Sequence, residues 1–262
     1  MTGTRTTSRK NTMIETGCRT DKGKRRENNE DSFMAFSEQN VFAVADGVGG
    51  SNAGEIASST VTDGIRAYIE AEPISECRNE KELGAYLQKC VEVMNGKLFR
   101  LAGEDQRRSG MATTLVACYI REQKAYVVNV GDSRAYIRRG NDLFQVTEDH
   151  TYVNSLVKLG VITRDEAKVH TKGNVITRAM GAEEDVEPDF YQTDLEDGDI
   201  ILLCSDGLYG EVDDDNINRI IGEENSMENL ADRLVRAAND AGGRDNITVI
   251  CLRIGERSTD EQ

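Results

Sequence analysis

The chain alternates between short apolar runs and longer segments in which apolar residues recur every three or four positions. The runs are rich in β-branched residues, which is typical of strands buried on both faces. They cover Val41–Ala45, Thr114–Ile120, Ala125–Val130, Ala135–Arg138, Ile200–Cys204 and Ile247–Ile254. Short polar connections join the second, third and fourth runs, so we expect an antiparallel meander there.

The longer segments have the spacing of amphipathic helices, with one apolar face and one polar face. They cover Ala53–Glu72, Glu82–Leu101 and Met227–Ala241, and two shorter ones cover Tyr152–Leu159 and Arg164–Ala167. Antiparallel strands with helices between them predict an α+β domain built in layers.

The length of 262 residues allows one or two domains, and no long linker or internal repeat divides the chain. We expect residues 13–255 to form one domain, residues 1–12 to be a disordered tail or a cloning remnant, and residues 256–262 to be a flexible end. No apolar run approaches the ~18 residues of a membrane span. The polar, basic start has no apolar segment of the kind found in secretory signals.

Charge and cysteine content narrow the function further. The 47 acidic and 32 basic residues give a net charge of −15, which argues against nucleic acid as the main partner. The six cysteines are scattered without CxxC pairs, so a structural zinc site is not expected. Three of them lie in apolar runs and are interpreted as reduced core residues, which indicates a cytoplasmic protein.

Several acidic residues stand where apolar runs begin or end. Asp46 and Asp206 each follow a run and precede a glycine, Asp132 follows another run beside a glycine, Asp245 precedes Ile247–Ile254, and Glu30 and Asp31 precede a further apolar patch. Any one of them could be ordinary turn chemistry. Together they predict that distant acids converge in one site.

Converging carboxylates repel one another unless they are protonated or bind cations. Oxygen ligands without nearby His or Cys favour Mg²⁺ or Mn²⁺, and two such ions can lower the pKa of a bridging water. Arg26 lies four residues before Glu30 and is suited to bidentate capture of phosphate. The alternative for Arg26 is that it is one of several charges in the basic run Lys22–Arg26.

Eight short motifs follow one another in a fixed order along residues 13–254. They are Arg26–Asp31 (RENNED), Asp46–Gly50 (DGVGG), Gly110–Thr114 (GMATT), Val130–Arg134 (VGDSR), Thr147–His150 (TEDH), Asn174–Gly181 (NVITRAMG), Cys204–Gly207 (CSDG) and Gly243–Asn246 (GRDN). In these segments and their order the chain resembles the metal-dependent protein phosphatases, the PPM family of type 2C serine/threonine phosphatases, in their compact bacterial form.

The resemblance implies a four-layer α-β-β-α sandwich, in which helices flank two antiparallel sheets, with a flap subdomain at about residues 146–181. It implies Mn²⁺ or Mg²⁺ ions in a cleft between the sheets. The implied ligands are Asp46, Asp206 and Asp245 for the first ion, Glu30, Asp46 and the Gly47 carbonyl for the second, and Asp132 and Asp206 for a weaker third ion seen in bacterial relatives.

The implied reaction is hydrolysis of phosphoserine and phosphothreonine in proteins by in-line attack of a metal-bridging hydroxide, without a phosphoenzyme. Arg26 would bind the substrate phosphate. Asp31 would not bind an ion itself but would orient the metal-bound waters. The flap residues His150, Asn174 and Arg178 would influence substrate choice. The implied partners are phosphoprotein substrates and an opposing serine/threonine kinase, and we expect a monomer.

Two positions depart from the family pattern. Animal members carry a His, proposed as general acid, where this chain has Val48, so the acid is unidentified and a metal-bound water is the candidate. Ala112 stands where the family has the glycine of a Gly-Thr-Thr turn. This change is mild unless the backbone there needs a positive φ. His150 has either a structural, flap-positioning role or a role in proton transfer.

Other motifs compete with this interpretation. Cys251–Ser258 fits the C-x₅-R-S loop of cysteine-dependent phosphatases, but its Cys lies in the middle of a predicted strand. Gly47–Asn52 resembles a dinucleotide loop without its last glycine, and Asp213–Asp215 resembles a calcium loop without its glycine. A catalytically dead relative acting as a binding module would lack ligand carboxylates, and none is missing here.

Overall fold

The structure is a computed structural model that describes residues 12–49 and 53–256. The expected tails were residues 1–12 and 256–262, and all of these except Thr12 and Glu256 lie outside the described residues, as does the end of the glycine-rich segment at residues 50–52. Thr12 is already the first residue of a strand.

Within the described residues, eleven strands form two antiparallel sheets. The first sheet has the order β1 (Thr12–Asp21), β11 (Ile247–Glu256), β10 (Ile200–Cys204), β7 (Arg134–Arg139), β8 (Asp142–Gln145). The second has the order β2 (Asp31–Phe36), β3 (Val41–Val48), β5 (Leu115–Arg121), β6 (Lys124–Val130), β9 (Asp189–Asp194), with β4 (Ala112–Thr113) paired to the end of β3.

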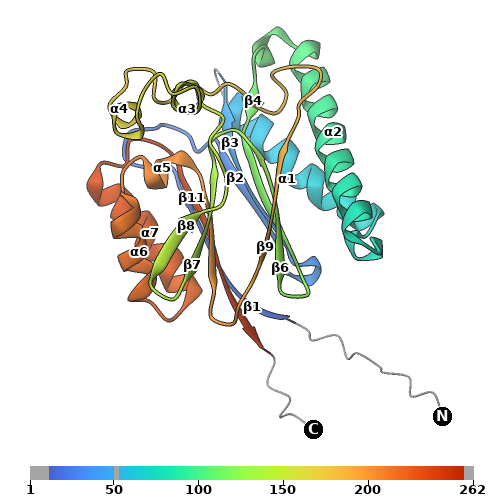
Figure 1. Ribbon diagram of the computed structural model, residues 1–262. Coiled ribbons are helices and arrows are strands. Elements are labelled where there is room, and N and C mark those ends of the chain that lie inside the picture. The colour runs from blue at the N-terminus through green and yellow to red at the C-terminus, as the bar shows by residue number, and fades with distance from the viewer. Residues whose placement is uncertain (1–11, 50–52, 257–262) are drawn as a thin grey trace, which may run out of the picture.

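Helices cover the outer face of each sheet (Figure 1). On the second sheet lie α1 (Ala53–Ala71) and α2 (Glu80–Glu104); on the first lie α5 (Asp206–Tyr209), α6 (Asp214–Gly222) and α7 (Met227–Ala241). At one end of the sandwich lie α3 (Tyr152–Lys158) and α4 (Arg164–Lys168). Single 3₁₀ turns cover Ser37–Gln39, Ile74–Glu76 and Gln106–Arg108.

Three layers of buried apolar side chains hold these elements together. One layer lies between α1, α2 and the second sheet, one between the two sheets, and one between the first sheet and α6 and α7. Phe42 of β3 and Leu252 of β11 are fully buried in the middle layer. Burial of apolar surface on both faces of each sheet is what makes the strands continuous apolar runs. The predicted α-β-β-α sandwich is confirmed.

The elements missed by sequence analysis are mostly those with weak apolar patterns. Strand β1 lies at a sheet edge and mixes polar with apolar residues, and β9 alternates between half-buried and exposed positions. Short α6 buries only Ile217, Ile220 and Ile221.

The predicted meander is wrong at one connection. Strands β5 and β6 pair as expected, but β7 leaves β6 and pairs with β10 and β8 in the other sheet. Gly131, with φ of +106°, starts the short crossing. The apolar pattern did not reveal this, because both sheets offer β7 a buried environment. The crossing places Asp132 at the junction of the two sheets.

No helix in the two described ranges has the length and apolar character needed to cross a bilayer.

Candidate active site

The acidic residues singled out by the sequence lie at strand ends on one end of the sandwich. This is the upper end in Figure 1, opposite the chain termini. Asp31 and Asp46 face each other as a cross-strand pair at the end of β2 and β3. From the other sheet, Asp206 follows β10 at the start of α5, and Asp245 lies two residues before the start of β11.

The charges of these acids act on one another across the junction of the sheets. Burial, followed by the charges of its four acidic neighbours Asp31, Asp206, Asp132 and Asp245, raises the pKa of Asp46 well above its usual range. Burial is also the main cause that raises the pKa of Asp31 to about 7, of Asp132 to about 8 and of Asp206 to about 6. The charged forms of these carboxylates are therefore destabilised unless a cation joins them.

Two buried oxygens in the cluster, Oδ1 of Asp31 and Oδ1 of Asp206, have no hydrogen-bond partner among the described residues. An unpaired buried carboxylate oxygen is costly, which makes these atoms free acceptors for a cation. Among residues 12–49 and 53–256, no three Asp, Glu, His or Cys side chains already stand in the arrangement of a formed ion site. The acids are gathered at the junction of the sheets, but their side chains do not adopt the geometry of ion ligands.

A second pair of oxygens converges at the start of α1. A Cβ built on Gly54 would lie 2.9 Å from Oε2 of Glu30 and 2.8 Å from the carbonyl oxygen of Gly47. The absence of a side chain at Gly54 leaves this space open. The backbone of Glu30 is fixed there, because its carbonyl accepts from the Gly47 N–H at 3.1 Å and from the Ser58 hydroxyl at 2.6 Å. Glu30 and the Gly47 carbonyl thus form an oxygen cradle suited to a hard cation.

Arg26 reaches the cluster from the loop between β1 and β2. Its Nη2 donates to Oδ2 of Asp245 at 2.6 Å, and its side chain is about half exposed. Asn246 clamps this loop, because its Nδ2 donates to the carbonyls of Lys22 and Asn28 and its Oδ1 accepts from the Glu30 N–H. A guanidinium held at the open edge of the acids is placed to bind an incoming anion.

Hydroxyl groups that sequence analysis did not select hold two of the acids. The Ser205 hydroxyl donates to Oδ2 of Asp31 at 2.7 Å and accepts from the Thr248 N–H at 3.0 Å. The Thr113 hydroxyl donates to the Asp46 carbonyl at 2.8 Å, and the Thr114 hydroxyl accepts from its N–H. These hydroxyl residues could have been found from their positions in the sequence, because Ser205 precedes Asp206 and the two threonines end the GMATT segment.

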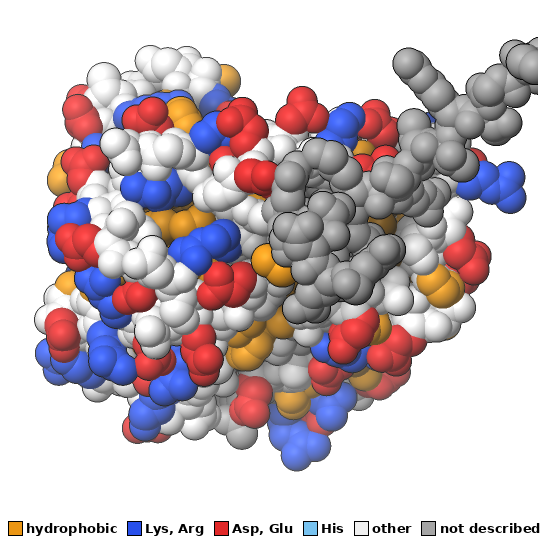
Figure 2. Space-filling view, turned by 90° about the horizontal axis from the view of Figure 1, so that it is seen from below, with side chains coloured by type: hydrophobic (Ala, Val, Ile, Leu, Met, Phe, Trp, Pro, Cys, Tyr) orange, Lys and Arg blue, Asp and Glu red, His pale blue; other side chains and the backbone are white. Residues whose placement is uncertain are grey.

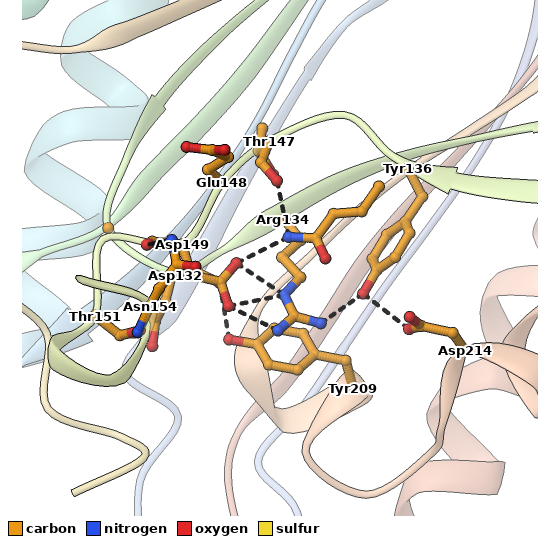
Figure 3. A network of polar contacts seen from close by, with 12 residues as sticks. Asp132, Arg134, Tyr136, Thr147, Glu148, Asp149, Thr151, Asn154, Tyr209 and Asp214 are labelled. Carbon is orange, nitrogen blue, oxygen red and sulfur yellow. Dashed lines mark hydrogen bonds and ion pairs between the residues drawn. The ribbon is translucent and has the colours of Figure 1, made fainter. Parts of the chain in front are cut away.

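The backbone of Asp132 is held by a polar network around Arg134 (Figure 3). The Tyr209 hydroxyl donates to the carbonyl of Asp132 at 2.8 Å. Arg134 makes a bidentate ion pair with Asp149, and both side chains are largely buried. Its Nη1 also donates to the Tyr136 hydroxyl at 2.8 Å. The network connects the sheet crossing to the start of the flap.

The flap residues are placed differently from one another. His150 is buried, and its Nδ1 accepts from the Gly131 N–H at 3.0 Å, so its proton is on Nε2, which lies 3.2 Å from Oδ2 of Asp189. Arg178 donates to Oδ1 of Asp189 at 2.6 Å. Burial, followed by the nearby Arg178, lowers the pKa of His150 despite Asp189. His150 is thus a neutral link between the crossing and the flap, whereas Asn174 is exposed.

Comparison with known proteins agrees with this arrangement. Residues 20–249 match the family described as protein phosphatase 2C. The chain belongs to the protein phosphatase 2C family. Protein phosphatase PhpP of Streptococcus pneumoniae is 35% identical over 251 residues, covering 94% of this chain and all of that protein. The serine/threonine phosphatase stp of Listeria welshimeri is 36% identical, covering 89% of this chain and 93% of that protein.

Solved structures agree in fold as well. Serine/threonine phosphatase Stp1 from Staphylococcus aureus superposes with a TM-score of 0.86 at 35% identity, over 97% of this chain and 99% of that one. The catalytic domain of PstP, solved in complex with two manganese ions, gives a TM-score of 0.82 at 33% identity, over 94% of this chain and all of that one. At least one structure similar to this protein phosphatase 2C, that of PstP, therefore holds metal ions.

Val48 and Ala112 are the two positions that depart from the family pattern. Val48 is 45% exposed and sits beside Gly47 without a titratable group. In the described chain the non-glycine residues with positive φ are Asn40, Glu122 and Gln123, so Ala112 has an ordinary backbone.

The rival motifs have other roles in the structure. Cys251 is fully buried in β11, and burial raises the pKa of its thiol, which disfavours the thiolate that a cysteine-dependent phosphatase needs. Asp213 caps α6 by accepting from the Asn216 N–H at 2.8 Å.

Proposed function

We propose that this protein phosphatase 2C hydrolyses phosphoserine and phosphothreonine in proteins and depends on divalent cations. The observation that carries the proposal is the gathering of Asp31, Asp46, Asp132, Asp206 and Asp245 at the junction of two sheets, beside the half-exposed Arg26. Relatives named serine/threonine phosphatase, about 35% identical over most of their length, support it.

The donor set fits Mn²⁺ or Mg²⁺, since it consists of oxygens and includes unpartnered buried ones. We assign Asp46, Asp206 and Asp245 to one ion, Glu30, Asp46 and the Gly47 carbonyl to a second, and Asp132 with Asp206 to a weaker third. Divalent ions supply Lewis-acid chemistry at such sites, because they neutralise phosphate charge and make water a better nucleophile.

The chain's own residues bind and orient the substrate. Arg26 offers two N–H groups to the phosphate oxygens, and its contact with Asp245 holds it at the edge of the acids. Asp31, fixed by the Ser205 hydroxyl, keeps one buried oxygen free to accept a hydrogen bond from water in the site. Val48 leaves no protein acid at its position, so protonation of the leaving group falls to solvent in the site.

The flap contributes to substrate binding. Arg178 and Asn174 lie on the same segment, and His150 anchors the flap base through Gly131 and Asp189. The neutral, buried state of His150 favours positioning over proton transfer.

The cellular setting follows from this chemistry. A phosphoserine and phosphothreonine phosphatase opposes a serine/threonine kinase, which we propose as its counterpart. We propose a monomer, because one chain supplies every residue of the site. We place it in the cytoplasm, since its six cysteines are all free and five of them are buried.

The test is hydrolysis of a phosphothreonine peptide with Mn²⁺, with and without EDTA, by the wild type and Asp206→Asn. We expect EDTA to abolish turnover and the variant to lose at least about 10²-fold in rate, since Asp206 serves two of the assigned ions. A rate that is independent of metal, or a fully active variant, would contradict the proposal.

A further inference from the structure

A groove of about 920 Å³ opens beside the candidate active site. One wall is α2, with Gln88, Glu92 and Asn95, and the other is the segment 174–187 at the end of the flap. Val48 also lines the groove, and it follows Asp46 and Gly47 directly in β3. The groove is therefore continuous with the mouth of the site.

One residue ties the wall of the groove to the acids. The backbone of Thr113 pairs with that of Met180 through two hydrogen bonds of 3.1 and 2.8 Å, and its hydroxyl donates to the Asp46 carbonyl at 2.8 Å. Segment 174–187 is thus attached to the strand end that carries Asp46. A substrate chain bound along this segment would lie in a defined position relative to the phosphate.

The lining of the groove is acidic. Five carboxylates and one basic residue line it: Glu92, Glu183, Glu184, Asp185, Glu187 and Arg178. Arg178 is already engaged by Asp189 at 2.6 Å, and Glu92 accepts from the Gln88 amide at 3.2 Å and lies 3.5 Å from Nζ of Lys89. Within the described ranges, the side chains of the other four acids make no ion pair or hydrogen bond. Their charge is available to a ligand.

The backbone of this acidic segment is held in place by a buried side chain. Asn95 of α2, only 1% exposed, donates through Nδ2 to the carbonyls of Glu183 and Glu184 at 3.1 and 2.9 Å. Its Oδ1 accepts from the Gly181 N–H at 2.7 Å. Fixing the backbone before binding reduces the ordering cost that a ligand would otherwise meet.

The concentration of charge is local and does not simply repeat the net charge of the protein. Over the opposite end of the molecule, acidic and basic side chains are interspersed (Figure 2). In the groove, the single lining arginine is paired with Asp189, and the other four acids, Glu183, Glu184, Asp185 and Glu187, have no basic partner among the residues that the structure describes.

We propose that this acidic groove binds the polypeptide beside the phosphorylated residue and selects substrates that carry Lys or Arg there. The proposal rests on the proposed phosphatase function and adds the substrate class. Basic side chains would pair with Glu183, Glu184 and Asp185, while Val48 and Ile176 provide apolar contact near the site mouth. Because the acids are exposed, the preference weakens with salt and is expressed mainly in KM.

The experiment compares two phosphothreonine peptides that differ only in flanking Lys/Arg or Gln residues. The variant is E183Q/E184Q/D185N. The control, D197N/D215N/E228Q, removes the same charge from exposed positions outside the groove. The readout is the ratio of kcat/KM for the basic and the neutral peptide within each protein, so that differences in ion loading cancel.

We expect a ratio of roughly ten in the wild type and the control at low salt, and a ratio near one in the groove variant. A wild-type ratio near one, or a preference that survives in the groove variant, would overturn the proposal. Failure of the wild type to hydrolyse both peptides and p-nitrophenyl phosphate would contradict the proposed function itself, and this inference with it.

Discussion

The guanidinium of Arg134 lies over the ring of Tyr209, with its Cζ 3.5 Å from the ring centroid. The edge of the guanidinium is paired with Asp149, while the Tyr209 hydroxyl donates to the Asp132 carbonyl. This stack therefore connects a candidate ion ligand at the crossing between the sheets with the residue that precedes His150 in the flap.

Replacing Arg134 with Lys should destabilise the protein. Lys retains the charge but loses both the bidentate geometry and the stacking on Tyr209. Because Asp149 is largely buried, we expect the free energy of unfolding in urea to fall by about 3 kcal/mol. Arg107 makes a similar bidentate pair with Asp105 at the surface, so Arg107→Lys should leave the urea midpoint unchanged. Equal losses in both variants would contradict a special role for the buried stack.

A side chain at Gly54 should weaken cation binding. The new Cβ of Gly54→Ala would occupy the space between Oε2 of Glu30 and the Gly47 carbonyl. We expect Mn²⁺ affinity, measured by calorimetric titration, to fall roughly tenfold or more. Gly84 is the matched control: it also lies in a helix, and a Cβ there meets no atom within 4 Å. Gly84→Ala should keep Mn²⁺ affinity and add up to about 1 kcal/mol of stability. Undiminished Mn²⁺ affinity in Gly54→Ala would rule out the cradle.

The stability of the metal-free protein should fall as pH rises from about 5 to about 8. Burial raises the folded-state pKa of Asp206 to about 6, of Asp31 to about 7 and of Asp132 to about 8, above the 3.8 of a free Asp. A raised pKa contributes stability below the unfolded value, and this contribution is lost as pH passes the folded value. Urea midpoints in EDTA across this range measure the effect, and Asp132→Asn should flatten the upper part. Midpoints that rise toward pH 8 would show that the acids are not destabilised when charged.

Ser205→Ala should impair the site without touching an assigned ligand. The variant leaves Oδ2 of buried Asp31 without its donor. We expect a roughly 10–100-fold loss in Mn²⁺ affinity or in kcat. Ser59, whose hydroxyl donates to the Glu55 and Ile56 carbonyls of its own helix, provides the control Ser59→Ala. A wild-type Mn²⁺ isotherm together with a wild-type kcat would dismiss Ser205 as a positioning residue.

His150→Ala should change peptide binding but not the pH dependence of turnover. His150 is neutral, and its Nδ1 already accepts from Gly131. We expect a higher KM for phosphopeptides because the flap loses its anchor, with a pH–rate profile of unchanged shape. Loss of one limb of that profile would instead assign proton transfer to His150.

The buried strands and amphipathic helices could be predicted from the sequence, whereas the edge strands and the passage of β7 into the other sheet could not. Ile200–Cys204 and Met227–Ala241 were predicted with their observed bounds, because the first is buried on both faces and the second buries a helical stripe. Strand β1 was missed because one of its sides has no neighbouring strand, so its apolar pattern is weak. The assignment of β7 to its sheet depended on the turn at Gly131, not on hydrophobicity.

The sequence by itself determined which chemistry the chain can support: oxygen ligands at strand ends next to glycines, an arginine near them, and the ordered segments of one phosphatase family. Only the tertiary structure decided how those groups meet. It brought Asp46 and Asp206 from different sheets to one junction, fixed the neutral form of His150, and opened a groove between α2 and segment 174–187. The physical reason is that periodicity records which face of an element is buried, while proximity between distant residues arises from the packing of whole layers.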